Sequence, residues 1–206
     1  GFLVSKFNMF PFVVTLSTQL IIRGFAQVIS GGQSIPVTNS TFKQIYSAKA
    51  GILPVPIILL IVVTVVMYLL LHWTKYGRYV FAVGDNMQAA IASGVNVFKV
   101  KTIAYTISGL LAGIAGIIFT AKTGSAQSNI GVGYETDAVA ACVLGGTSFA
   151  GGITTIPGVL MGIFIIGFIY NGMNLIGIDS YYQSMTKGIV IILAVLLDMV
   201  MNKKNA

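Results

Sequence analysis

Residues able to carry out acid–base, nucleophilic or metal chemistry are few in this sequence, and they do not cluster. One histidine, His72, and one cysteine, Cys142, exclude a histidine or cysteine metal site and an internal disulfide framework. The five acidic residues are scattered along the 206 residues. The glycine-rich stretch GGTSFAGG, residues 145–152, lacks the Gly-Lys-Ser/Thr ending of a phosphate-binding loop. The sequence therefore predicts no catalytic residues, no metal site and no cofactor site in this chain.

The most distinctive short segment is VGDNMQAAIASGVNV, residues 83–97, which is small and polar between long apolar runs. Asp85 is predicted to cap a two-turn helix over 86–93, with Gln88 completing a capping-box-like pair. Gly94 is predicted to end the helix. Its narrow apolar face comprises Met87, Ala90, Ile91 and Gly94. With no nucleophile and no acid–base pair, the segment either docks into another protein or lies on the membrane as an amphipathic helix.

The rest of the chain has the composition of a membrane protein. It is 56% hydrophobic and 8% charged, with a mean hydropathy of +0.90, whereas a soluble domain carries about 25% charged residues. An all-α polytopic membrane protein is therefore predicted. Runs near the required ~20 apolar residues occur at 10–29, 52–73, 103–121, 153–173 and 181–201. Glycines four apart, at 109 and 113 and at 158 and 162, predict close helix contacts.

The net charge of +7 is interpreted as a topology signal and not as a nucleic-acid-binding surface. Basic residues on both sides of 83–97 put that segment in the cytoplasm. They are Lys75, Arg78, Lys99 and Lys101. With this orientation the five runs need one more inward passage, and only 137–152 is available for it. Because this stretch is short and glycine-rich, a short or broken element covered by neighbouring helices is predicted.

Several stretches, in order along essentially the whole chain, resemble one family. They are PFVVTLSTQLIIRGFAQVISGG, TKYGRYVFAVGDN, the pattern N-x-x-A-A-x-x-S-G-V-N-V beginning at Asn86, YETDAVAACVLGGTSFAGG, and SYYQSMTKGIVIILAVLLD. Together they are similar to permease subunits of bacterial ABC importers for simple sugars, in the ribose and galactose branch. The resemblance implies a multi-pass protein of the bacterial inner membrane. Residues 1–206 would be one transmembrane permease domain, lacking the N-terminal helices of the family.

The resemblance also implies partners. The short cytoplasmic helix would dock into a cleft of a separate ATP-binding cassette subunit, which uses the ATP. The residues implied in this coupling are Asn86, Ala89, Ala90 and Gly94. The broader loop pattern has Glu where this chain has Gln88, so a charged contact is not expected there. A second permease subunit, giving a homodimer, and a periplasmic or lipid-anchored sugar-binding protein would complete the importer in the lipid. Its sugar would be galactose, methylgalactoside or ribose.

A few polar residues have two interpretations each. Glu135 and Asp137 either supply negative charge at a helix start or contact the binding protein. Arg23 is expected to extend to the membrane surface. Candidates to line a sugar path, or to hydrogen-bond between helices, are Tyr170, Asn171 and Asn174. An ion-coupled secondary transporter is the alternative function, although its usual intramembrane acids are missing from the centres of the apolar runs.

Overall fold

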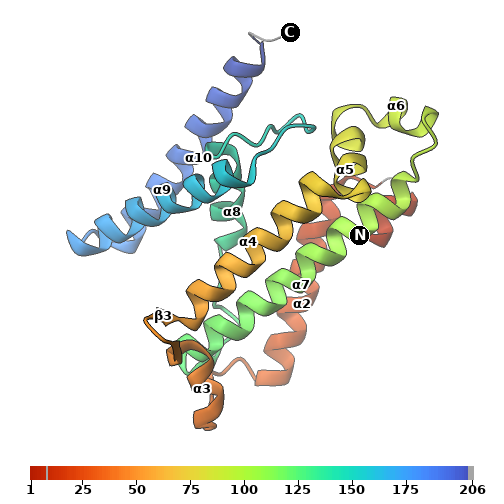
Figure 1. Cartoon of the computed structure of the whole chain (residues 1–206). Coiled ribbons are helices and arrows are strands. Elements are labelled where there is room, and N and C mark those ends of the chain that lie inside the picture. Colours follow the sequence, from red (N-terminus) through yellow and green to blue (C-terminus); the bar gives the residue numbers. More distant parts are fainter. Residues whose placement is uncertain (8, 204–206) are drawn as a thin grey trace. The chain divides into compact units, whose positions relative to one another are not determined.

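The computed structural model describes residues 1–7 and 9–203, and this part of the chain is mainly helical (Figure 1). Side chains at 50, 180 and 197–203 lie outside the description. The predicted all-α class is confirmed. Chain contacts define two compact units, one of residues 1–79 with 90–130 and one of 80–89 with the chain from 131 onward. The assignment of 1–206 to a single permease domain stays a prediction.

The first unit contains three long helices. Its elements are α1 (Phe2–Phe7), α2 (Pro11–Ser30), β1 (Ile35–Pro36), α3 (Ser40–Ser47), β2 (Lys49–Ala50), β3 (Leu53–Pro54), α4 (Val55–Trp73), α7 (Val97–Thr123) and β4 (Ser125–Ala126). The two-residue strands pair antiparallel, β1 with β4 and β2 with β3. The β1–β4 pair ties the loop after α2 to the end of α7, and the Val37 amide donates to the Gly124 carbonyl at 2.9 Å.

Local sequence explains where these long helices begin and end. Proline stands in the first turn of α2 and of α4, where its missing amide hydrogen costs nothing. Helix α2 ends at Gly31 in the left-handed region, with φ of 60°. In α7, the Asn96 side chain accepts from the Lys99 amide at 3.0 Å, and Gly124, with φ of 68°, ends the helix. Four helices of the described part are long and apolar enough to cross a membrane, namely α2, α4, α7 and α9.

The second unit is built around a short helix. Its elements are α8 (Tyr134–Leu144), α9 (Ile156–Leu175) and α10 (Ser180–Lys203). Helix α8 packs against α9 and α10, and its Ala140 and Ala141 are 1% and 4% exposed. After α8 the chain turns through irregular structure before α9 begins. The predicted short or broken element over 137–152 is therefore present as an eleven-residue helix and a glycine-rich loop.

Glycine lets α8 and α9 approach at backbone distance. A Cβ built on Gly162 would collide with the Ala141 carbonyl oxygen, and one on Gly158 with the Gly145 carbonyl oxygen. The predicted close contact at 158 and 162 is thus confirmed. The corresponding prediction at 109 and 113 is wrong within the described chain, since a Cβ at either position meets nothing within 4 Å. Small residues permit a close contact, but a helix must also be there to make it.

Candidate functional site

The segment predicted to dock forms α6 (Met87–Ala92), which follows α5 (Lys75–Asp85). Its capping residue is Asn86 and not Asp85, because the Ala89 amide donates to Asn86 Oδ1 at 3.0 Å. Asp85 instead ends α5, where the Asn86 amide donates to the Ala82 carbonyl at 3.1 Å. Asp and Asn cap equally well, and the residues around Asp85 gave no local signal for a helix that runs up to position 85.

The end of α6 follows the prediction. Gly94 has φ of 80°, in the left-handed region that favours glycine. Its amide donates to the Ile91 carbonyl at 2.9 Å, and the Val95 amide donates to the Ala90 carbonyl at 3.0 Å. Both bonds satisfy carbonyls that the last turn of a helix leaves unpaired. The six-residue helix is therefore held at both ends, so it can keep one shape without being long.

The two alanines of α6 are in different environments. Ala90 is 4% exposed, so its own chain covers it, whereas Ala89 is exposed. Ile91 is 50% exposed beside them. Of the residues implied in ATPase coupling, Asn86, Ala89 and Gly94 are exposed and Ala90 is buried. The surface available for docking is therefore small. Among the described residues of α6, Ile91 is the one large apolar side chain that is well exposed.

Hydrogen bonds hold the ends of the loop that carries α6. The Tyr76 hydroxyl donates to the Val100 carbonyl at 3.2 Å, joining the start of α5 to the start of α7. Burial raises the pKa of Tyr76, so the phenol stays a neutral donor. At the turn from α4 into α5, the Gly77 amide donates to Thr74 Oγ1 at 3.1 Å. A Cβ on Gly77 would overlap the Leu71 carbonyl, so only glycine fits this turn.

In the second unit, the end of α5 touches the loop after α8. A Cβ on Gly84 would lie 2.7 Å from the Gly152 nitrogen, and one on Gly151 would collide with the Gly84 carbonyl oxygen. Gly151 and Gly152 have φ of 99° and 74°. The last two glycines of GGTSFAGG therefore allow a backbone-to-backbone contact with Gly84 and Asp85 at the end of α5.

A charged cluster joins the three helices of the second unit. Lys187 Nζ on α10 lies 2.8 Å from Asp137 Oδ2 on α8, and the Tyr170 hydroxyl on α9 donates to Asp137 Oδ1 at 3.0 Å. The Lys187 ammonium is also 4.6 Å from the centre of the Tyr170 ring, close enough for a cation–π interaction. The Lys187 and Asp137 side chains are 26% and 17% exposed. Each oxygen of the carboxylate thus has a partner from a different helix.

This cluster separates residues that the sequence grouped together. Glu135 is exposed, and its Oε2 accepts from the Gly133 amide at 3.1 Å, which matches the helix-start interpretation. Asp137, in the same first turn, instead pairs with Lys187 and accepts from Tyr170 within the unit. The pairing with Lys187 was not predicted, because the two residues are fifty positions apart and no local pattern connects them.

The α9 residues considered for a sugar path are only partly brought together. Tyr170 points to Asp137, as described. Asn174 Oδ1 accepts from Gln183 Nε2 at 2.9 Å, and the same Gln183 nitrogen donates to the Ile178 carbonyl at 2.9 Å. Asn171 is exposed on the helix surface. For Tyr170 and Asn174 these bonds match the helix-contact interpretation. Whether any of the three lines a path stays a prediction.

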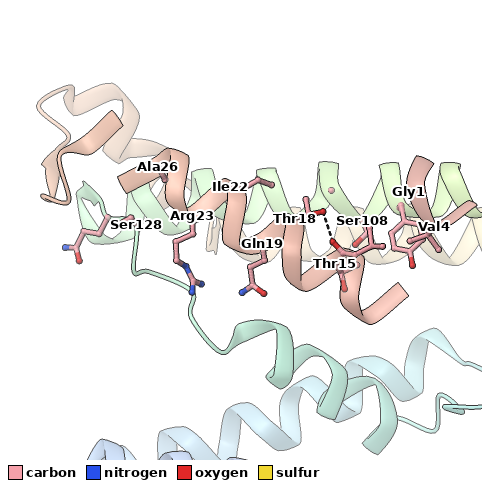
Figure 2. A pocket seen from close by; sticks show the side chains of 14 residues that line it. Gly1, Val4, Thr15, Thr18, Gln19, Ile22, Arg23, Ala26, Ser108 and Ser128 are labelled. Atoms are coloured by element: carbon pink, nitrogen blue, oxygen red, sulfur yellow. Dashed lines mark hydrogen bonds between the residues drawn. The ribbon is translucent and has the colours of Figure 1, made fainter. Parts of the chain in front are cut away.

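The first unit contains a cavity that was not predicted from the sequence. It has a volume of about 580 Å³ and is lined chiefly by α2 and α7 (Figure 2). Thr15, Gln19 and Arg23 line it from α2 at four-residue intervals, and Ser108 does so from α7. The spacing of 15, 19 and 23 places the three polar side chains on one helix face, and this is the signal from which the lining could have been predicted. Among the described residues, no group of three His, Cys, Asp or Glu side chains could hold a metal.

Comparison with known proteins assigns the chain to a family. Residues 1–195 match the family described as "Branched-chain amino acid transport system / permease component". The chain belongs to this permease family. The matched range includes the four helices of the described part that could span a membrane. The chain is therefore a multi-pass protein of the bacterial inner membrane, as predicted.

Relatives within this permease family are named for sugars. The chain is 44% identical over 208 residues to "Ribose import permease protein RbsC" of Bacillus subtilis, covering 100% of this chain and 64% of that protein. It is 44% identical over 210 residues to RbsC of Escherichia coli K12, with the same coverages. "L-arabinose transport system permease protein AraH" of Escherichia coli K12 is 38% identical over 198 residues, covering 96% and 60%.

The chain spans less than two thirds of the length of these relatives, about 64% of RbsC. No solved structure matches it. The predicted resemblance to sugar-importer permeases is confirmed by these relatives.

Proposed function

We propose that this chain is part of a transmembrane permease subunit of an ATP-driven ABC importer for a monosaccharide. The observation that supports this most is the match to ribose import permeases at 44% identity along the whole chain. A short capped helix between two candidate spans, α6 between α4 and α7, supports this proposal, because it could dock to a cytoplasmic ATPase. The chain itself would be non-catalytic and would need no cofactor, because a partner subunit would hydrolyse the ATP.

The sugar we propose is ribose or another monosaccharide of similar size. Relatives named for ribose, D-allose and L-arabinose share 38–44% of aligned residues with the chain. Galactose and methylgalactoside stay within the proposal as alternative substrates. All of these are neutral polyols, so the path would need side chains that hydrogen-bond to sugar hydroxyls.

The proposed coupling element is α6. An ATP-binding cassette subunit would receive it through Asn86, Ala89 and Gly94, with Ile91 as the exposed apolar contact. Pre-organisation supports this role, because a helix already fixed at both ends loses little conformational freedom on docking. Ala90 would act indirectly, by packing α6 onto its own chain.

Two further partners complete the proposal. A second copy of the subunit would form the other half of the path across the lipid. A periplasmic or lipid-anchored sugar-binding protein would deliver the sugar on the outer side. There, exposed Glu135 is the better candidate contact and Asp137 the weaker one, because Asp137 is already paired with Lys187.

Reconstituted vesicles test this function. The full-length subunit, reconstituted with an ATP-binding cassette subunit and a sugar-binding protein, should take up radiolabelled ribose when ATP is supplied. This uptake should continue when an uncoupler is present. Uptake that needs no ATP and stops with the uncoupler would instead support an ion-coupled secondary transporter. ATP-dependent uptake of a branched-chain amino acid but of no sugar would overturn the substrate class.

A further inference from the structure

The cavity between α2 and α7 contains polar groups at a depth where they are costly. Gln19 is the ninth residue of the twenty-residue helix Pro11–Ser30, near the middle of a candidate span. Gln19 and Arg23 are half-buried, and both line the cavity. Figure 2 shows their side chains leaving α2 in the same direction. Polar groups inside a membrane span are a functional signal, because each must be hydrated or hydrogen-bonded to be tolerated.

The spacing on α2 produces a ladder. Residues four apart are displaced by only about 40° around a helix and by about 6 Å along it. The hydroxyl of Thr15, the amide of Gln19 and the guanidinium of Arg23 therefore follow one another on one face of α2. Ser108 adds a hydroxyl from α7, and the half-buried Tyr105 adds an aromatic ring.

The chemistry of the lining fits a neutral polyol. The Gln19 amide can both donate and accept, and a guanidinium offers several donors in a fixed fork. The Thr15 hydroxyl donates to the Pro11 carbonyl at 3.0 Å, so it can accept a hydrogen bond from a ligand. Such a set matches vicinal hydroxyls, while an aromatic ring suits the apolar face of a sugar ring. Arg23 is the one charged side chain among the described residues that line the cavity. At about 580 Å³ the cavity is within the usual range for small-molecule sites, roughly 300–1,000 Å³.

We propose that Thr15, Gln19 and Arg23 on α2, with Ser108 on α7, form a binding subsite for a neutral monosaccharide on the translocation path. This rests on the proposed function and adds the location at which the sugar is held. The four-residue spacing lets a sugar exchange hydrogen bonds stepwise along α2. Arg23 is then part of the subsite, and its expected role at the membrane surface is replaced.

Transport by matched variants tests the subsite. Gln19→Met in the full-length subunit removes the amide and keeps the volume. Gln27→Met makes the same change on α2 at an exposed position that does not line the cavity. In vesicles with the ATPase and the binding protein, Gln19→Met should raise the KM for ribose uptake about threefold to tenfold, the equivalent of one hydrogen bond. Gln27→Met should not change it. Equal KM values for the two variants would overturn the proposal.

A binding measurement separates the subsite from the transport function. With Cys142 replaced by Ser, Thr15→Cys should react more slowly with a membrane-permeable thiol reagent when millimolar ribose is present. The control Ser17→Cys, on another face of α2, should react at an unchanged rate. Protection of Thr15→Cys without ATP-driven uptake would support the subsite and contradict the proposed importer function. ATP-driven uptake without protection would support the importer function and contradict the subsite. Protection by ribose 5-phosphate but not by ribose would contradict a neutral ligand.

Discussion

Asp137 on α8 and Lys187 on α10 form an ion pair of 2.8 Å across fifty residues of sequence. The Tyr170 hydroxyl on α9 holds the second carboxylate oxygen. One carboxylate therefore fastens three helices, at a place where neither charge is fully exposed to water. In such a setting the loss of one partner costs more than the pair contributes, because the other charge stays half-buried.

Asp137→Asn should lower the stability of the full-length subunit. We expect a loss of about 1–3 kcal/mol, since the change leaves Lys187 without its counter-charge. The thermal unfolding midpoint in detergent measures it. Glu135→Gln is the matched control, because Glu135 lies on the same helix but is exposed. The double exchange Asp137→Lys with Lys187→Asp should recover part of the loss. If Asp137→Asn and Glu135→Gln have equal midpoints, the pair does not stabilise the unit.

Gly162→Val should separate α8 from α9. The added side chain would meet the Ala141 carbonyl and the Gly145 nitrogen, and overpacking of this kind costs about 1–3 kcal/mol. Gly167→Val is the control on the same helix, because a Cβ at 167 meets nothing within 4 Å. The difference between their unfolding midpoints in detergent isolates the contact. No difference would mean that the helices approach less closely than described.

Ala89→Leu and Ala90→Leu should fail in different ways. Ala89 is exposed, so leucine there should weaken co-purification of the ATPase tenfold or more and leave the unfolding midpoint of the subunit unchanged. Ala90 is 4% exposed, so leucine there should lower the midpoint itself. A helix that only lies on the membrane would bind lipid better with leucine at 89. Undiminished ATPase recovery with Ala89→Leu would therefore refute docking at that position.

The orientation predicted from charge is tested by labelling single cysteines in a Cys142→Ser background. Gln88→Cys, on α6, should react with an impermeant thiol reagent only in inside-out vesicles. Ser40→Cys, at the start of α3, should react only in intact spheroplasts. Both positions are exposed, so accessibility within the chain does not limit the reaction. The opposite pattern would invert the topology and remove the basis for docking of α6 to a cytoplasmic partner.

Sequence alone predicted the long helices well, because a membrane span needs a long apolar run and little else. The run 52–73 became Val55–Trp73, and 153–173 became Ile156–Leu175. Each start moved by three residues, to where proline fits the first turn. The glycine end of α6 was also predictable, because a positive φ at Gly94 is a local requirement. All of these features depend on residues close together in the chain.

Features that depend on distant residues were not predictable. Nothing near Asp137 in sequence indicates Lys187, and nothing near Ile35 indicates its strand partner Ala126. The burial of Ala90 beside exposed Ala89 depends on which face of α6 meets the chain, and the pattern of small residues left this open. The cavity on α2 needed α7 to complete it. In each case the sequence indicated one residue of the contact, but no local pattern indicated which distant residue it would meet.

The contact between Gly84 and Gly151 restricts how this protein can vary. Both surfaces are main chain, so a side chain added at either position cannot be offset by trimming a neighbour. The contact between the end of α5 and the loop after α8 contains no side chain that could change rotamer, so the two main-chain segments cannot move closer together. A displacement of one segment toward the other would therefore be transmitted directly through the main chain. This direct transmission requires that both positions remain glycine.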